Sequence, residues 1–164
     1  MCIFKVQTPA LFYMTKSVLL LASFLLLLPA CSESFLYEKA YEPSNELWTY
    51  EEPLVFDFNI PDTSESYTFY LDIIHAVDYP FQNLYTKIKT VYPDQDDRSD
   101  VLSLELSNEL GLWQGNCKSK YCKVRIPLQV DALFSATGAY QLELNQFTRR
   151  DSLPGLKSLA LRIQ

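Results

Sequence analysis

The stretch Leu54-Val55-Phe56-Asp57-Phe58-Asn59-Ile60 shows most clearly the residue pattern from which the fold of this chain is predicted. Large apolar side chains occupy every second position, and Asp57 and Asn59 fall between them. A period of two places alternate side chains on opposite faces of a β-strand. The stretch is therefore predicted to be a strand with one face in a hydrophobic core, ended by the turn residues Pro61-Asp62-Thr63.

Six later stretches repeat this alternation, so we expect about seven strands. The six stretches cover residues 67–73, 84–89, 102–107, 122–129, 140–145 and 159–163. Strands with one apolar and one polar face pack most simply as two antiparallel sheets, face to face. We therefore predict an all-β domain over residues 54–164, an antiparallel β-sandwich of immunoglobulin-like or jelly-roll-like kind. A closed barrel is the alternative. A small barrel usually needs glycines at its tightly curved corners, and the chain has only four glycines, which disfavours a barrel.

Upstream of this domain, an apolar run ends in Leu28-Pro29-Ala30-Cys31. The run begins at Val18, just after Lys16, and is too short for a membrane-spanning helix of about 20 residues. A small residue followed by cysteine is the pattern at which bacterial lipoprotein precursors are cleaved and acylated. We predict a lipoprotein signal peptide over residues 1–30 and a lipidated Cys31, with an ordinary secretory signal as the alternative. Met14 could be the true start.

After cleavage the chain would carry 12 Lys and Arg against 20 Asp and Glu, a net charge of −8. This charge disfavours nucleic acid and an electrostatic hold on anionic lipid. Membrane attachment would then rest on fatty acyl chains at Cys31, and two chains suffice for stable anchoring. Residues 31–53 show no sustained hydrophobic period, so we predict that they are the lipid anchor and a tether.

Cys117 and Cys122 are the two cysteines that remain in the mature domain. In an oxidising envelope compartment they could form a disulfide across a four-residue loop, or stay as free thiols. A zinc site would need two further ligands, and the chain has one histidine, His75, far away in sequence. We therefore predict no metal and no cofactor.

Catalysis is not favoured by the sequence. The single histidine, His75, ends a predicted strand, and no nucleophile elbow of the GxSxG type is present. We expect His75 to be a strand-edge hydrogen-bonding residue, and the chain not to be an enzyme. The acidic loop from Asp94 to Asp100 could gather calcium, but it lacks the glycine and final glutamate of an EF-hand, so a solvated turn is expected.

Aromatic residues cluster in Asp78-Tyr79-Pro80-Phe81-Gln82-Asn83-Leu84-Tyr85. A Tyr-rich end of a sandwich would suit binding of a protein or a sugar, if the rings are exposed. The alternative is that these rings are half-buried in the sheet faces.

Several pieces of the chain, in order, resemble the GldH family of gliding-motility lipoproteins of Bacteroidota. The pieces are the cysteine motif at Cys31, the Tyr-rich segment after it, Phe56-Asp57-Phe58-Asn59-Ile60-Pro61-Asp62-Thr63, Tyr67 with its strand, Asp78-Tyr79-Pro80-Phe81-Gln82-Asn83-Leu84-Tyr85, Gly111-Leu112-Trp113-Gln114-Gly115 and the closing strand from Gly155 to Arg162. Together they span nearly the whole mature chain. Cys117 and Cys122 depart from the family pattern.

The resemblance implies a non-enzymatic accessory of gliding motility and of the associated type IX secretion machinery, acting by protein–protein contact. It supplies no catalytic residues. We expect the interaction surface to lie around Tyr79, Phe81, Tyr85 and Trp113, and the partners to be the membrane and envelope proteins of that machinery. The cell envelope is the expected location, with the outer membrane favoured over the inner. A carbohydrate-binding or nutrient-uptake lipoprotein is the alternative, and a hydrolase that uses His75 is a weaker one.

Overall fold

The computed structural model describes residues 34–94 and 96–164. The predicted signal peptide over residues 1–30, the start at Met14 and the lipidation of Cys31 lie outside the described residues. Ser34–Gln164 form one unit. Within the described part of the chain, no helix has the length and apolar character needed to cross a membrane.

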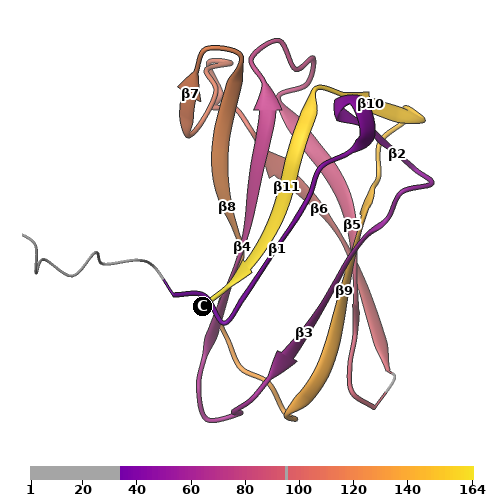
Figure 1. The fold of residues 1–164 in the computed structure, drawn as a ribbon, viewed down its shortest axis with the longest axis vertical. Helices are drawn as coiled ribbons and strands as arrows, with labels where there is room; N and C mark the ends of the chain where they lie inside the picture. The colour runs from indigo at the N-terminus through magenta and orange to yellow at the C-terminus, as the bar shows by residue number, and fades with distance from the viewer. Residues whose placement is uncertain (1–33, 95) are drawn as a thin grey trace, which may run out of the picture. The chain divides into compact units, whose positions relative to one another are not determined.

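Two antiparallel sheets make up the body of the domain (Figure 1). The five-stranded sheet has the order β1 (Tyr37–Tyr41), β11 (Leu156–Ile163), β4 (Tyr67–Ala76), β8 (Tyr121–Ala132) and β7 (Asn116–Lys118). The four-stranded sheet has the order β3 (Leu54–Ile60), β9 (Gly138–Gln146), β5 (Asn83–Val91) and β6 (Asp97–Glu105). A small third sheet pairs β2 (Leu47–Thr49) with β10 (Ser152–Pro154), after the 3-10 turn η1 (Ser44–Glu46).

The hydrophobic core lies between the two large sheets and follows the period of two seen in the sequence. In β3, burial alternates along the strand as the sequence predicts, and Phe56 and Ile60 are fully buried. Leu71 and Ile73 of β4 and Leu144 of β9 are also fully buried. The predicted antiparallel β-sandwich is confirmed, and the sheets keep separate edges rather than closing on each other.

The prediction of about seven strands is wrong, because the described residues form eleven. The seven expected stretches correspond to β3, β4, β5, β6, β8, β9 and β11. The other four are β1, β2, β7 and β10, of which three have only three residues. A strand that short has no room for a measurable period, so the sequence pattern cannot reveal it.

The predicted tether over residues 31–53 also needs correction, because the folded domain begins at Ser34 rather than at residue 54. Tyr37–Tyr41 pairs with β11 along its whole length, and the pairing depends on backbone groups rather than on an apolar pattern. Trp48 is fully buried, and its Nε1 donates a hydrogen bond to the carbonyl of Glu52 at 2.8 Å.

We call the two ends of the sandwich the proximal and the distal end (Figure 1). At the proximal end, Leu36 donates a backbone hydrogen bond to Ile163, and Thr68 and Gln164 bond each other, so the described chain starts and finishes there. The loops that follow β3, β5 and β8 lie at the same end. The distal end carries the β4–β5 loop, the β6–β7 loop and the residues that follow β9.

Candidate interaction surface at the distal end

Two glycines fix the loop that carries Trp113. Gly111 and Gly115 have φ angles of +76° and +80°, a region that favours glycine. A Cβ on Gly115 would overlap the backbone carbonyl of Lys123, so this position also needs the missing side chain. The Nε1 of Trp113 donates a hydrogen bond to the carbonyl of Val77 at 2.9 Å. The β6–β7 loop is thereby fastened to the β4–β5 loop.

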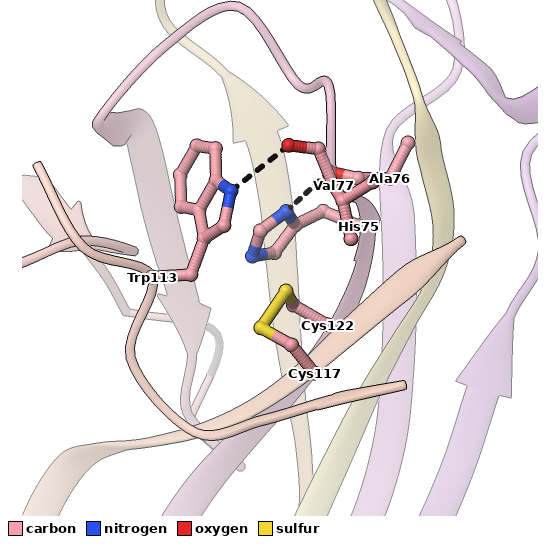
Figure 2. Close-up of a disulfide and its surroundings, with 6 residues drawn as sticks. All are labelled: His75, Ala76, Val77, Trp113, Cys117 and Cys122. Carbon is pink, nitrogen blue, oxygen red and sulfur yellow. Dashed lines mark hydrogen bonds between the residues drawn. A yellow bond between two sulfur atoms is a disulfide. The ribbon is translucent and has the colours of Figure 1, made fainter. Parts of the chain in front are cut away.

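A disulfide ties β7 to β8 beside this loop (Figure 2). Cys117 lies directly opposite Cys122 in the β7–β8 hairpin, and their Cα atoms are 3.9 Å apart. The sequence left a disulfide and two free thiols open, and the structure has the disulfide. Cys122 is fully buried and is the register partner of His75 in β4.

His75 is a structural residue of this end. It is fully buried, and its ring meets Trp113 edge-on with the centroids 4.6 Å apart (Figure 2). Burial lowers the pKa of the imidazole, against the opposing effect of a hydrogen bond from Nδ1 to the carbonyl of Ala76 at 2.9 Å. The hydrogen bond was expected, but β4 is the middle strand of its sheet rather than an edge. A fully buried imidazole has no access to a substrate, which argues against the hydrolase alternative.

Tyr79 does not lie on the surface where it was expected. Its side chain is 4% exposed, and its ring packs between those of His75 and Phe81, with centroids 5.7 Å and 5.6 Å away. The chain reverses just after β4, where the N–H of Tyr79 bonds the carbonyl of Ala76, and this turn folds the ring inward. Burial raises the pKa of the Tyr79 phenol. The residue therefore supports the surface from beneath.

The other three predicted residues remain accessible to different degrees. Tyr85 is 46% exposed on β5. Phe81 and Trp113 are half-buried, and the guanidinium of Arg150 lies 5.6 Å from the Phe81 ring centroid. The structure thus places Phe81, Tyr85 and Trp113 at the distal end, with Tyr79 underneath.

Sequence reasoning missed the most exposed apolar residues of this end. Leu110 is 84% exposed and Leu112 is 62% exposed, on either side of Gly111. Phe147 is 54% exposed, and its N–H donates to the carbonyl of Tyr85 at 2.8 Å, so these two side chains leave adjacent backbone. We call the following residues the distal surface: Val77, Phe81, Tyr85, Leu110, Leu112, Trp113 and Phe147. The only signal for Leu110 and Leu112 was two leucines in a glycine turn outside any strand pattern.

No metal-ligand cluster accompanies this surface. Within residues 34–94 and 96–164, no three side chains of His, Cys, Asp or Glu come together as a metal ion would require. Asp97 and Asp100 of the acidic loop belong to β6, and Asp97 instead pairs with Lys89 at 2.7 Å. What the distal end offers chemically is apolar and aromatic contact area around a rigid turn.

Reducing the disulfide is expected to lower the free energy of unfolding by about 2 kcal/mol, because the bond closes only a short loop. Urea unfolding of the full-length protein in detergent, with and without dithiothreitol, measures the difference. A Cys117→Ala/Cys122→Ala variant is the control and should not respond to the reductant. A drop of less than about 0.5 kcal/mol on reduction would show that the disulfide adds no stability.

Fold and surface together define the class: a small antiparallel β-sandwich module with an apolar, turn-supported surface at one end. Within that class, the chain belongs to the GldH lipoprotein family, whose model matches residues 36–163. The match covers nearly all of the described domain, and it confirms the resemblance carried by the sequence motifs.

Two relatives match this chain over most of its length and over most of their own length. The gliding motility lipoprotein GldH of Flavobacterium johnsoniae is 24% identical over 145 residues, which is 88% of this chain and 88% of the relative. A gliding motility lipoprotein GldH homolog of Christiangramia forsetii is 21% identical over 155 residues, 90% of this chain and 94% of the relative. Among solved structures, a chain from the infectious bursal disease virus Gx strain is similar at a TM-score of 0.30 and 15% identity, over 84% of this chain and 34% of the viral one.

Proposed function

We propose that the protein is a lipid-anchored, non-enzymatic accessory of gliding motility and of the type IX secretion machinery linked to it. The observation that carries the proposal is the family match over residues 36–163, together with relatives named as gliding motility lipoproteins. The protein acts by contact with another envelope protein through the distal surface. The exposure of Leu110 and Leu112 supports this mode of action, since a patch of exposed large apolar side chains marks a site of protein–protein interaction.

The placement of the chain ends fits this mode of action. Ser34, the first described residue, follows the predicted lipid site Cys31 by three positions and precedes by two Leu36, whose backbone bonds Ile163 at the proximal end. The distal surface lies at the opposite end of the sheets. A lipid at Cys31 would therefore hold the protein near its partner and raise the effective concentration of the distal surface. We propose the outer membrane as its location.

Replacing Leu110 and Leu112 together by serine is expected to abolish gliding while leaving the fold intact. Both side chains are mostly exposed, so the change in stability should stay within about 0.5 kcal/mol. Full burial of one leucine side chain contributes about 1.5–3 kcal/mol, so the loss of two from an interface should weaken binding by tenfold or more. The test complements a gene deletion with the Leu110→Ser/Leu112→Ser variant, and scores colony spreading and secretion of type IX cargo against the wild-type gene.

Leu133→Ser is the matched control, because Leu133 is 75% exposed but follows β8 at the proximal end. This variant should restore spreading and secretion as the wild type does. If the deletion itself leaves both phenotypes unchanged, the motility function is refuted. If the double variant restores both at normal protein level, the distal surface is refuted and the function is not.

A further inference from the structure

The two large sheets are not sealed equally along their two sides. On one side, β1 of the first sheet lies against β3 of the second. On the other side, a cavity of about 300 Å³ opens between the sheets, next to β6 and β8. Its lining is mostly apolar and includes Phe58, Phe69, Ile88, Leu102, Leu128 and Phe134. This cavity lies beside β6 and β8 rather than at the loops of the distal surface.

The inward faces of β6 and β8 lose their cover as the strands approach the proximal end. In β6, Leu104 is 3% exposed, Leu102 is half-buried and Asp100 is exposed, although all three share one face. In β8, Val124 is 4% exposed, whereas Ile126 and Leu128, on the same face, are half-buried. Inward-facing side chains of a sandwich are normally covered by the opposite sheet. The sheets therefore leave an open cleft here, with an apolar floor.

Backbone hydrogen-bonding groups line both sides of this cleft. Within the described residues, β6 pairs only with β5, so its outer edge carries no strand. β7 covers only the first residues of β8, and the stretch from Ile126 to Ala132 pairs only with β4 in the described part of the chain. A free strand edge binds an extended peptide through its N–H and C=O groups. A fatty acyl chain has no hydrogen-bond donors or acceptors along its length, so it could not pair with these strand edges.

The charge at the rim of the cleft also selects the occupant. Asp100 faces inward at the cavity, opposite Ile88 in register. Among the neighbouring charges, Asp97 pairs with Lys89, and the guanidinium of Arg98 lies 5.7 Å from the centroid of the Tyr92 ring, which also lines the cavity. A carboxylate at the rim attracts Lys or Arg and repels the head group of a free fatty acid. The rim and the strand edges both point to a basic peptide.

We propose that the cleft between β6 and β8 binds an extended segment of another envelope protein. The segment pairs its backbone with the free edge of β6 and places one large apolar side chain in the cavity. A Lys or Arg beside that side chain meets Asp100. This site is separate from the distal surface, so the protein would join two partners or grip one partner at two places.

Site-specific photo-crosslinking in living cells tests the proposal. A photoreactive amino acid is placed at Arg98 or at Gln129 of the full-length protein, one on each side of the cleft. The expected result is that both positions capture the same short segment of one protein, mapped by mass spectrometry. Lys87, exposed on the outer face of the same sheet, is the control position and should not capture it. Adducts to lipid, to a second copy of this chain or to scattered proteins, or no adducts, would overturn the proposal.

A synthetic peptide of the captured segment then tests the role of Asp100. The Asp100→Lys variant of the full-length protein in detergent should bind the peptide about tenfold more weakly than wild type. Glu65→Lys, an exposed change of equal charge in the β3–β4 loop, should bind as wild type does. Equal affinity of the Asp100→Lys variant would mean that Asp100 only protects the edge from unspecific pairing, and would overturn the proposed recognition. The Leu110→Ser/Leu112→Ser variant should keep the crosslinks, which separates this test from that of the distal surface.

Discussion

Replacing Asp72 by asparagine is expected to lower the free energy of unfolding by about 3 kcal/mol, because Asp72 is a buried carboxylate paired with several cations. Asp72 lies in β4 with its side chain 3% exposed. Its carboxylate binds Arg125 at 2.7 Å, Arg162 at 3.1 Å and Lys123 at 3.4 Å. Asparagine keeps the shape of the side chain but removes the charge that these three cations share.

The surroundings of the cations set the size of this effect. The Arg125 and Arg162 side chains are 32% and 18% exposed, and the Phe35 ring lies over both guanidiniums at 5.6 Å and 4.7 Å. Partly covered cations that lose their carboxylate keep some desolvation cost. Lys123, which is 50% exposed, can turn to water, and Arg162 keeps its ion pair with Glu38 at 2.6 Å. The loss is therefore expected near the lower end of the range for buried pairs.

The same cluster predicts an acid-dependent loss of stability. Burial alone would raise the pKa of the Asp72 carboxyl, but the hydrogen bond and charge of Arg125, with the charges of Lys123 and Arg162, hold it below its usual range. A carboxyl with a lowered pKa in the folded state stabilises the fold above its unfolded pKa of about 3.9. That contribution is lost as the pH falls through the folded pKa. Below about pH 4, the Asp72→Asn variant should therefore lose stability less steeply than wild type.

Asp97→Asn is the matched control for these measurements. Asp97 pairs with Lys89 at the same 2.7 Å, but the two side chains are 54% and 39% exposed. A solvated pair of this kind contributes about 0.2–1 kcal/mol. Urea unfolding of both variants from pH 3 to pH 7 distinguishes burial from distance. Equal losses in the two variants would show that the Asp72 cluster behaves as a surface ion pair.

The alternation in the sequence predicts the strands that form the hydrophobic core but not the short strands at the sheet edges. Where one face is buried, as in Leu54–Ile60, the alternation must appear in the sequence, and it did. β1 is an edge strand that pairs by its backbone with β11, and such pairing leaves little trace in side-chain type. The burial of Asp72 is not predicted for a related reason, because a charged residue on the polar face of a strand is expected to be exposed to solvent.

In the loops of the distal surface, too, the sequence pattern does not predict which side chains are buried. The residue types at Tyr79 and Phe81 correctly marked an aromatic end, but the turn after β4 decides which ring faces inward. Burial of a loop residue depends on which side chains pack over it, and the spacing of apolar residues in the sequence does not contain this information. The prediction that Tyr79 lies on the surface is therefore wrong. The exposure of Leu110 and Leu112 is not predicted, because leucine is usually a core residue.

Removing the thiol at position 31 is expected to release the protein from the membrane and to abolish its function. The test variant carries Cys31→Ser behind an ordinary cleavable secretory signal in place of residues 1–30, so that an uncleaved signal cannot hold it in the membrane. Each buried CH₂ of an acyl chain contributes about 0.8 kcal/mol to membrane binding, so the loss of two chains leaves no comparable attraction. A mature net charge of −8 repels anionic lipid rather than replacing the anchor.

Cell fractionation and intact-mass spectrometry check this prediction. Wild-type protein should fractionate with the membrane and carry fatty acyl mass on Cys31, and the variant should be soluble and unmodified. Cys2→Ser is the matched control, because this thiol precedes the predicted cleavage point and should affect neither property. Soluble, unacylated wild-type protein would contradict the anchor. The folded unit begins at Ser34 and its disulfide does not involve Cys31, so a folded variant that fails to restore gliding would show that the distal surface acts only when held at the membrane.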